Sequence, residues 1–351
     1  MAHLALYRSW RPKTFNEVVG QDYIVTALRM AVVNEEIAHA LLFTGTRGTG
    51  KTSLAKIYAR AINCLNPQEG NPCNACDVCT SALDGSLMDI MEIDAASNNS
   101  VDNIRSITDE VHFTPSLARY KVYIIDEVHM LSTSAFNALL KTLEEPPAHA
   151  VFILATTDPQ RIPATILSRC QRFDLKRIGD RHMMERLAQI AEAEKITIDN
   201  EALLTIAHLA DGALRDAISL LDQTNAATTG DITRKDILDL VGMVDDNFMG
   251  QIIAALIRGD AGALLNYIHE MVLEGEDIYR FCMDLTQYYR NILVTQTTRR
   301  PQDILRVPRQ TLAGLKQLAN AYSQKKVVEI IQFLAITARD LKQAPNPRIS
   351  L

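Results

Sequence analysis

The stretch Gly45–Thr52 reads G-T-R-G-T-G-K-T and decides the fold of this chain. It matches the pattern G-x-x-x-x-G-K-S/T, in which glycines let successive backbone N–H groups turn inward onto an anion. Lys51 supplies a positive charge for phosphate oxygens, and Thr52 supplies a hydroxyl for Mg²⁺. We therefore predict a site for the phosphates of a nucleotide. Its residues are Gly45, Thr46, Arg47, Gly48, Thr49, Gly50, Lys51, Thr52 and Ser53.

The flanks of this stretch provide the structural context that the pattern needs. Ala40–Thr44 is a short apolar run, as expected of a buried strand, and Ser53–Ala61 has the composition of a helix. The N-terminus of such a helix would face the phosphates. A glycine-rich turn that occurs by chance is the alternative, but strand, loop and helix in this order argue against it.

Length and composition limit the remaining possibilities. The 351 residues can form two or three domains, and 47% hydrophobic with 22% charged residues is typical of a globular protein. The net charge of −6 argues against a chain that is basic throughout, so contact with DNA would need a local patch or partner subunits. No apolar run approaches the ~20 residues of a membrane span, and the N-terminus lacks a signal-peptide core. We therefore expect a cytoplasmic protein that does not span or bind a membrane.

Four cysteines follow the predicted helix with the spacing C-x8-C-x2-C-x2-C: Cys64, Cys73, Cys76 and Cys79. Four thiolates at such short spacing suit tetrahedral zinc and leave no open position for a substrate. We predict a structural zinc site, with buried or redox-active thiols as the alternative. Cys170 and Cys282 stand alone in the sequence and are expected to be ordinary buried thiols.

Two carboxylates, Asp126 and Glu127, follow the apolar run Val122–Ile125. Ligands of parallel sheets bind outside the carboxyl ends of the strands, so these side chains should lie beside the phosphate loop. We predict that Asp126 helps Thr52 to hold Mg²⁺ and that Glu127 polarises the attacking water. His129 completes the sequence D-E-V-H, but we interpret it as a structural neighbour.

The rest of the first half alternates between strand and helix patterns. We expect strands at 87–94 and 150–156, and helices at 22–34, 101–111 and 134–144. A residue within Ser97–Ser100 is expected to cap the helix at 101–111. Thr157 follows the second strand, where a polar side chain can reach a phosphate or the water. Arg169 lies between apolar residues and needs a partner, with a surface ion pair as the alternative reading.

The second half is helical throughout. Short connections at 175–179 and 241–247 separate a helical segment, 180–240, from a second one that begins at Phe248. Arg215 should lie early in a helix of the first segment. The apolar face expected at the start of the second segment consists of Phe248, Ile252, Ile253, Leu256 and Ile257.

Several motifs occur together and in order: Y-R-S-W-R-P-K-T-F-N-E-V-V-G-Q, the phosphate loop, the four cysteines, V-Y-I-I-D-E-V-H-M-L, F-N-A-L-L-K-T-L-E-E-P-P, L-A-T-T-D, I-L-S-R-C and G-A-L-R-D-A. This combination closely resembles the gamma/tau family of bacterial DNA polymerase III, the ATPases of the sliding-clamp loader. The dense matches run from Tyr7 to about Ala217. From Phe248 onward the resemblance rests on helical pattern and length.

The resemblance implies an α/β AAA+ P-loop ATPase domain, with a parallel sheet and flanking helices, followed by a small helical lid and an all-α collar. We assign residues 1–178 to the ATPase domain with its zinc-binding insertion (64–79), 179–242 to the lid and 243–351 to the collar. The resemblance implies that the family continues into a further collar helix, so the chain is expected to be truncated at its C-terminus.

The resemblance also implies an activity and partners. The chain would bind and hydrolyse ATP with Mg²⁺, as the motor subunit that loads the sliding clamp onto primed DNA during replication within the DNA polymerase holoenzyme. It would form a hetero-pentamer with delta, delta-prime and other gamma/tau copies. Longer forms add domains for the polymerase core and the replicative helicase.

Particular residues receive roles from the same resemblance. Thr157 would be the sensor-1 residue, and Arg215 the sensor-2 arginine that contacts the subunit's own nucleotide. Arg169 would act in trans, as a finger that reaches the γ-phosphate in a neighbouring subunit. The residues that would lie against the adenine are Tyr7, Arg11, Pro12, Val18 and Val19.

Two other functions compete with this one. A hexameric AAA+ DNA motor of the branch-migration helicase type shares the phosphate loop and the arginines, but the four-cysteine insertion and S-R-C argue against it. A non-hydrolysing scaffold subunit like delta-prime keeps S-R-C and the zinc but has a degraded nucleotide site. The intact Lys51, Thr52, Asp126 and Glu127 argue against the scaffold.

Overall fold

The computed structural model describes residues 5–243, 246–273, 277–305, 307 and 309–342. The chain divides into two compact units: Met1–Ile196 with Ile206–Gln223, and Thr197–Thr205 with Thr224–Leu351. Among the described residues, no helix combines the length and apolar character that a bilayer crossing requires.

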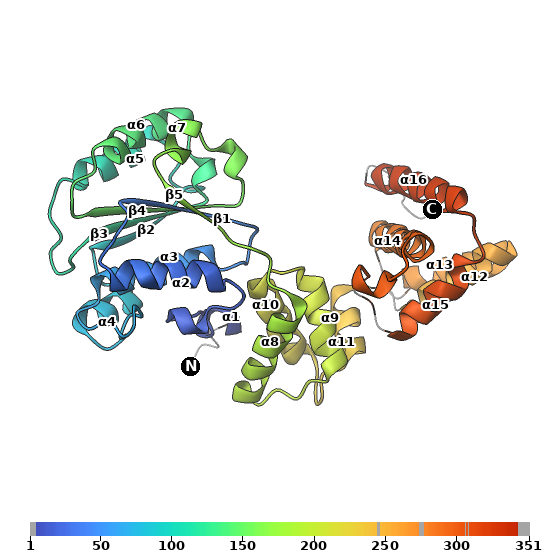
Figure 1. Ribbon diagram of the computed structural model, residues 1–351. Helices are drawn as coiled ribbons and strands as arrows, with labels where there is room; N and C mark the ends of the chain where they lie inside the picture. The colour runs from blue at the N-terminus through green and yellow to red at the C-terminus, as the bar shows by residue number, and fades with distance from the viewer. Residues whose placement is uncertain (1–4, 244–245, 274–276, 306, 308, 343–351) are drawn as a thin grey trace. The chain divides into compact units, whose positions relative to one another are not determined.

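A five-stranded sheet forms the centre of the first unit, with the strand order β2-β3-β4-β1-β5 and every pairing parallel (Figure 1). Carboxyl ends of parallel strands meet at one edge, so the segments that follow β1, β3 and β4 converge there. The strands are β1 (Ala40–Thr44), β2 (Ile90–Asp94), β3 (Lys121–Asp126), β4 (Ala150–Thr156) and β5 (Gln171–Asp174).

Helices cover both faces of this sheet, which explains why β1 and β4 are buried along their whole length. In Figure 1, α2 and α3 lie on one face, and α5, α6 and α7 lie on the other. Each face has its own apolar core. The helices of this region are α1 (Leu6–Ser9), α2 (Asp22–Val33), α3 (Lys51–Asn63), α4 (Asp77–Asp84), α5 (Val101–Glu110), α6 (Thr133–Glu144) and α7 (Ala164–Leu167), with 3-10 turns η1 (Phe15–Glu17), η2 (Val128–Met130) and η3 (Pro159–Arg161).

The predicted strand, loop and helix around the phosphate loop are confirmed, although α3 begins at Lys51, two residues earlier than expected. The predicted cap of α5 is also confirmed, because the Ser100 hydroxyl accepts from the N–H of Asn103. Ser132 caps α6 in the same way, from the N–H of Ala135.

Two strands differ from the sequence analysis. The strand expected at 87–94 begins only at Ile90. The Asp89 carboxylate instead accepts backbone N–H groups from Ser116, Leu117 and Ala118, at 2.9, 2.8 and 2.9 Å, and so holds the loop before β3. Strand β5 was not predicted, since only Phe173 in it is buried and its other residues are polar.

A helical segment follows, and the connection predicted before it is confirmed. The connection at 175–179 has no helix or strand, and its ends are fixed by hydrogen bonds from Leu175 N to Thr44 O (2.7 Å) and from Ile178 N to Gly212 O (3.2 Å). The helices are α8 (Asp180–Glu194), α9 (Asn200–Ala210), α10 (Leu214–Ala227) and α11 (Arg234–Val241).

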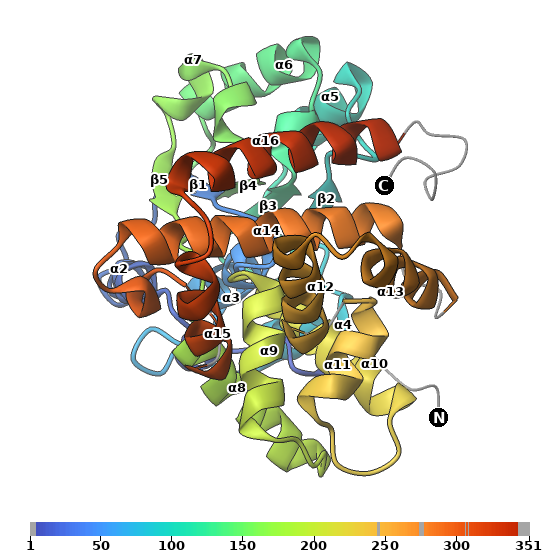
Figure 2. The same ribbon diagram turned by 90° about the vertical axis from the view of Figure 1, so that its right-hand side faces the viewer.

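The rest of the second unit is helical, and α14 and α16 lie side by side in it (Figure 2). The connection predicted at 241–247 is shorter, because α11 includes Val241 and α12 begins at Asp246; residues 244–245 lie outside the described residues. The elements are α12 (Asp246–Arg258), α13 (Ala261–Leu273), α14 (Ile278–Thr297), η4 (Pro301–Asp303), α15 (Arg309–Ala319) and α16 (Gln324–Leu341).

The apolar face predicted for α12 was partly wrong. Met249, Ile252 and Ile253 are buried, whereas Leu256 and Ile257 are about two-fifths exposed. The sequence pattern is compatible with a buried face that contains Met249 or one that contains Leu256 and Ile257, because both sets lie at helical spacing from Ile252 and Ile253. Packing against the core of the second unit selects the stripe that contains Met249.

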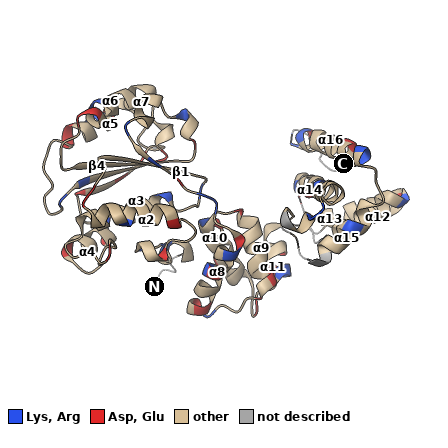
Figure 3. Ribbon diagram, viewed as in Figure 1, with Lys and Arg blue, Asp and Glu red and all other residues tan. Residues whose placement is uncertain are grey.

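Acidic and basic residues are interspersed on the helices of the first unit (Figure 3). This distribution fits a chain whose formal net charge is −6. The expectation that contact with DNA needs a local patch or partner subunits stays a prediction.

Candidate nucleotide site and metal site

A cavity of about 950 Å³ opens in the first unit at the carboxyl edge of the sheet. Such a volume is within the usual range for small-molecule sites. Its wall comes from an N-terminal segment that we call the arm (residues 7–19), from the phosphate loop and α3, from the ends of β2 and β3, and from helices α8 and α10. The lining residues that the sequence predicted are Tyr7, Arg11, Pro12, Val18, Val19, Arg47, Gly48, Thr49, Gly50, Lys51, Thr52, Ser53, Asp126, Glu127 and Arg215.

The phosphate loop has the conformation that its glycines permit. Gly48 and Gly50 have φ values of 78° and 102°, which lie in the left-handed region. A Cβ atom at Gly48 would lie 2.7 Å from the Cβ of Ala213, so a side chain there would clash with the segment that leads into α10. The glycine therefore allows close contact between loop and helix.

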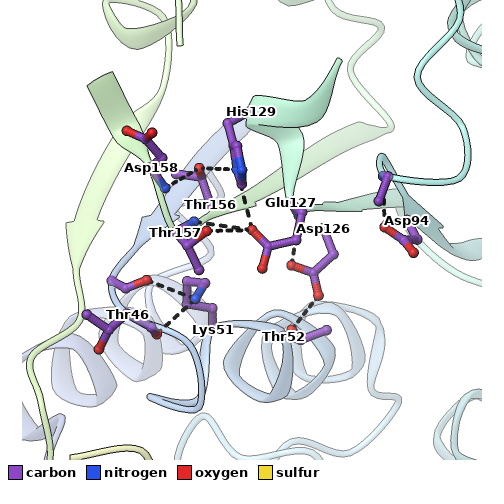
Figure 4. Close-up of polar contacts among 12 residues, drawn as sticks. Thr46, Lys51, Thr52, Asp94, Asp126, Glu127, His129, Thr156, Thr157 and Asp158 are labelled. Atoms are coloured by element: carbon purple, nitrogen blue, oxygen red, sulfur yellow. Dashed lines mark hydrogen bonds and ion pairs between the residues drawn. The ribbon is translucent and has the colours of Figure 1, made fainter. Parts of the chain in front are cut away.

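Lys51 begins α3 and is almost fully buried. Its ammonium donates to the carbonyl oxygens of Gly45 (2.9 Å) and Thr46 (3.0 Å), as Figure 4 shows. Burial lowers the pKa of Lys51, and the negative charges of Glu127 and Asp126 oppose that shift. Gly45 and Thr46 thus contribute carbonyl groups to the lysine. Within the phosphate loop, the residues that line the described cavity are Arg47 and those after it.

Thr52 and Asp126 meet across the cavity floor. The Thr52 hydroxyl donates to Asp126 Oδ2 at 2.6 Å, and Asp126 Oδ1 accepts the N–H of Glu127 at 2.9 Å (Figure 4). A hydroxyl beside a carboxylate is an oxygen pair of the kind that Mg²⁺ prefers. These two residues therefore fit the predicted role in holding magnesium together with nucleotide phosphates.

Glu127 is held in place by its neighbours. Its Oε2 accepts from the hydroxyl and the N–H of Thr157, at 2.9 and 3.3 Å. Its backbone is left-handed, with φ 48° and ψ 43°, a conformation that costs a non-glycine residue of order 1–3 kcal/mol. Strain of this kind is common at functional sites, since the surrounding structure must compensate for it.

Among the described residues, His129 does not line the cavity. It contacts the residues beside Glu127, and we interpret it as a structural neighbour. Its Nδ1 lies 3.1 Å from the Thr156 hydroxyl and 3.4 Å from Glu127 Oε2 (Figure 4). Thr156 also accepts the N–H of Asp158 at 3.0 Å. The ends of β3 and β4 are thereby joined through side chains around Glu127.

The arm and α10 bring two predicted arginines to the cavity. Arg11 donates from Nε to the Ser53 hydroxyl at 3.2 Å, next to the phosphate loop. The guanidinium carbon of Arg215 lies 4.8 Å from the centre of the Tyr7 ring, a cation–π distance. Hydrogen bonds from Arg8, and then from Arg215, lower the pKa of Tyr7. Both arginines therefore face the position predicted for the nucleotide.

Arg169 does not belong to the cavity wall in the part of the chain that the structure describes. Its guanidinium donates to Glu144 Oε1 and, at 2.7 Å, to the carbonyl of Thr165. The side chain is about one-third exposed. Within this chain Arg169 thus forms the surface ion pair that was the alternative interpretation of the sequence.

Sequence reasoning missed several lining residues. Asp94 is the last residue of β2, and this position at a carboxyl strand end was a signal that could have identified it, whereas Glu92 lies in the middle of the same strand. Lys56, one helical turn after Thr52, forms an ion pair with Glu92. Arg186 has no local signal, because only the packing of α8 brings it to the cavity. The missed residues are Arg8, Trp10, Glu17, Lys56, Glu92, Asp94, Ile178, Arg186, Leu214 and Ile218.

The four predicted cysteines converge at the C-terminus of α3 and the N-terminus of α4. The sulfur atoms of Cys64, Cys73, Cys76 and Cys79 all lie within 4.8 Å of one another. Tetrahedral zinc with Zn–S bonds of ~2.3 Å requires sulfur separations of ~3.8 Å, so a small contraction would satisfy it. The set therefore fits zinc.

Backbone N–H groups already point at two of these sulfurs, as they do around bound thiolates. Cys73 N donates to Cys64 Sγ (3.2 Å), and Cys76 N donates to Cys73 Sγ (3.3 Å). Of the two isolated cysteines, Cys282 is buried as predicted, whereas Cys170 is only partly buried. Burial raises the pKa of Cys170 to about 11.

The fold and site together define a P-loop ATPase fold of the AAA+ class. The solved structure of the Thermotoga maritima RuvB Holliday junction branch migration motor matches with a TM-score of 0.50 at 21% identity, over 71% of this chain and 79% of that one. At this identity the likeness concerns the fold alone. It agrees with the fold class predicted from the sequence.

Family comparisons cover nearly the whole chain. The profile "DNA polymerase III, delta subunit" matches residues 20–179, "DNA polymerase III clamp loader subunit, ATPase lid domain" matches 182–230, and "DNA polymerase III subunits gamma and tau domain III" matches 232–351. The predicted lid and C-terminal helical region thus have matching family profiles.

Curated relatives agree with these profiles. DNA polymerase III subunit gamma of Buchnera aphidicola is 41% identical over 79% of this chain and 78% of its own length. Subunit tau of Bacillus subtilis is 44% identical, and that of Escherichia coli 37%, over 99% and 100% of this chain. The chain spans 62% and 54% of the lengths of those two tau subunits. The chain belongs to the DNA polymerase III gamma/tau family.

Proposed function

We propose that this chain is the ATP-driven motor subunit of a DNA polymerase III clamp loader, which binds and hydrolyses ATP to load the sliding clamp onto primed DNA. One observation carries the proposal. One cavity is lined by Lys51, Thr52, Asp126 and Glu127. The Lys51 ammonium donates to a loop carbonyl, Thr52 donates to Asp126, and Glu127 accepts from Thr157. A scaffold subunit would have no reason to keep this complete set.

Each group receives a role in binding. The triphosphate would lie along the loop and the N-terminus of α3, where free N–H groups and the Lys51 ammonium favour negative charge. Mg²⁺, held through Thr52 and Asp126, would neutralise phosphate charge. Tyr7, Arg11, Pro12, Val18 and Val19 would form the wall against the adenine.

Further groups receive roles in hydrolysis. Glu127 would orient and polarise the attacking water, and Thr157 would position both Glu127 and the γ-phosphate. Arg215 would contact the phosphates of its own subunit, since it lines the same cavity. Arg169, which lies outside that cavity, would exchange its pairing with Glu144 for the γ-phosphate of a neighbouring subunit.

The proposed assembly contains delta, delta-prime and other gamma/tau copies in a hetero-pentamer. ATP binding would arrange the subunits so that they open the ring-shaped clamp and grip primed DNA, and hydrolysis would release both. In longer forms, added domains would bind the polymerase core and the replicative helicase. We retain 1–178, 179–242 and 243–351 as the proposed ATPase, lid and collar domains.

The test of this function is the steady-state ATPase rate of the chain with its partner subunits, with and without clamp and primed DNA. A clamp loader should be stimulated by clamp and primed DNA together. A branch-migration motor would respond to DNA without the clamp, and a scaffold would hydrolyse no ATP under any of these conditions.

Replacing Lys51 with alanine should lower ATP affinity about 100-fold, because a buried charged donor to the phosphates is lost. The fold should remain, since the lysine ammonium contacts only loop carbonyls. Titration calorimetry with ATP and Mg²⁺ measures the affinity, and thermal unfolding checks the fold. Lys141→Ala, an exposed position on α6, is the matched control. Unchanged affinity in Lys51→Ala would exclude the loop as the site.

Metal analysis of freshly reduced protein should find about one zinc ion per chain, because four thiolates fill a tetrahedral site. Cys76→Ser should release the metal and raise proteolytic cleavage within residues 64–79, since this segment has little apolar core of its own. Cys282→Ser, outside the cluster, should keep the zinc. Reduced protein without zinc would contradict the assignment.

A further inference from the structure

We propose that the cysteine loop (residues 64–79) holds the adenine-side wall of the nucleotide cavity in place, and that Asn71 and Asn74 are the positioning residues that transmit this support. The inference rests on the proposed function, because it assumes that the cavity binds ATP. It gives the predicted zinc an effect on nucleotide binding, although the four cysteines contribute nothing to the described cavity wall.

The first step is a set of contacts between the cysteine loop and the arm. The Asn71 side chain is buried, and its Oδ1 accepts the N–H of Phe15 at 2.9 Å. Its Nδ2 lies 3.4 Å from Asn16 Oδ1. Asn74 donates from Nδ2 to the carbonyl of Lys13 at 3.2 Å. Backbone groups of the arm thus bind side chains of the loop.

The same arm forms the cavity wall on both sides of these contacts. Arg11 and Pro12 precede the contacted segment, and Val18 and Val19 follow it, and all four line the cavity. The segment between them contains one short 3-10 turn, η1. Its position is held partly within the arm, where Glu17 accepts from Lys13 N (3.0 Å) and from the Thr14 hydroxyl (2.8 Å), and partly by groups outside the arm.

Two arginines add hydrogen bonds between the arm, the cysteine loop and the helices α2 and α3. Arg60 lies on α3, the helix that begins at Lys51, and donates from Nη2 to the carbonyl of Lys13 at 2.8 Å. Arg29 on α2 donates to the Glu69 carbonyl (3.0 Å) and to Asn16 Oδ1 (3.3 Å). The Lys13 carbonyl therefore accepts from both α3 and the cysteine loop.

The two asparagines are also close in sequence to the metal ligands. Asn71 lies two residues before Cys73, and Asn74 follows Cys73 directly. Besides a metal, the loop is held by the paired backbone hydrogen bonds between Gln68 and Asn71, at 2.9 and 2.8 Å, and by the contact of Arg29 with Glu69. Asn74 also has a left-handed backbone, with φ 54°. Fixing the sulfur of Cys73 in a metal site would therefore restrict the backbone that carries both asparagines.

These contacts support the base side of the cavity and leave the phosphate side to α3 and the loop. The combined variant Asn71→Ala/Asn74→Gly should therefore bind MgATP about tenfold more weakly, as expected for the loss of three hydrogen bonds, of which the one from Phe15 N to Asn71 Oδ1 is buried. Its affinity for inorganic tripolyphosphate with Mg²⁺, which has no base, should not change. Glycine at position 74 permits the left-handed backbone.

The experiment measures both ligands by titration calorimetry on the full chain, with zinc content and thermal unfolding recorded for each sample. Asn66→Ala is the matched control, because Asn66 is an exposed asparagine of the same loop. Asn74→Gly alone, at a half-buried position, provides a milder variant in case the combined one does not fold. Wild-type protein stripped of zinc by a chelator should show the same selective loss for MgATP.

The outcomes separate the two hypotheses. A loss confined to MgATP, in the variants and in the stripped protein, supports the inference. Equal binding of MgATP by the variants and the wild type, or an equal loss of both ligands, would overturn it while the proposed function stands. A wild-type chain that binds neither ligand would overturn the proposed function and this inference with it.

Discussion

A Glu127→Gln chain is expected to bind ATP with nearly normal affinity and to hydrolyse it about 10²–10⁴-fold more slowly, the usual contribution of a positioned general base. Glutamine keeps the size of the side chain and an oxygen that can accept from Thr157. It loses the negative charge that polarises the attacking water. Binding and chemistry should therefore respond differently to this substitution.

Single-turnover hydrolysis and equilibrium ATP binding are the two measurements for this variant. Glu36→Gln, at an exposed position after α2, controls for the change of charge. Thr157→Val should show a smaller loss in the same step, because it removes one of the two hydrogen bonds to Glu127 Oε2 and keeps the backbone one. A Glu127→Gln chain that turns over at the wild-type rate would remove Glu127 from this role.

Arg169→Ala should abolish most of the ATPase activity of the assembled complex while leaving ATP binding by the isolated chain unchanged. Arginine fingers in other nucleotide hydrolases contribute ~10³–10⁵ in turnover, and a guanidinium suits the task because it stays charged and can bridge phosphate oxygens. Arg169 is partly exposed and lies outside its own cavity, so it is available to a neighbour. Its partner within the chain, Glu144, is exposed and can be left solvated.

Mixed assemblies test whether Arg169 acts in trans. Arg169→Ala subunits have intact nucleotide sites, and Lys51→Ala subunits have intact fingers. Some interfaces in a mixture pair a good site with a good finger, so activity should rise above that of either variant alone. If the mixture remains as inactive as its components while assembly is confirmed, the trans assignment is wrong.

Arg215→Ala is the control for this experiment, because Arg215 lines the cavity of its own subunit. Mixing Arg215→Ala with Lys51→Ala should restore nothing, since both substitutions damage the site of the subunit that carries them. The replacement of Glu144 by glutamine provides a second control. It breaks the ion pair within the chain and should leave an Arg169 finger functional.

The sequence was sufficient to identify the phosphate loop, the four cysteines and the two carboxylates after β3. Each of these features is a local pattern whose chemistry depends on residue type and spacing, so neighbours along the chain carry the signal. Strands β1 and β4 were predictable for the same reason, because strands buried on both faces are continuous apolar runs. The family motifs extended this reading to Thr157, Arg169 and Arg215.

Tertiary structure decided what local pattern could not. Strand β5 is largely polar and exposed, so its pairing with β1 alone makes it a strand. The buried stripe of α12 depends on the helices that pack against it, and Arg186 reaches the cavity only because of where α8 lies. The contacts of Asn71 and Asn74 with the arm join segments more than fifty residues apart. Spacing along the chain carries no information about such contacts, because they arise only when separate elements meet in the folded protein.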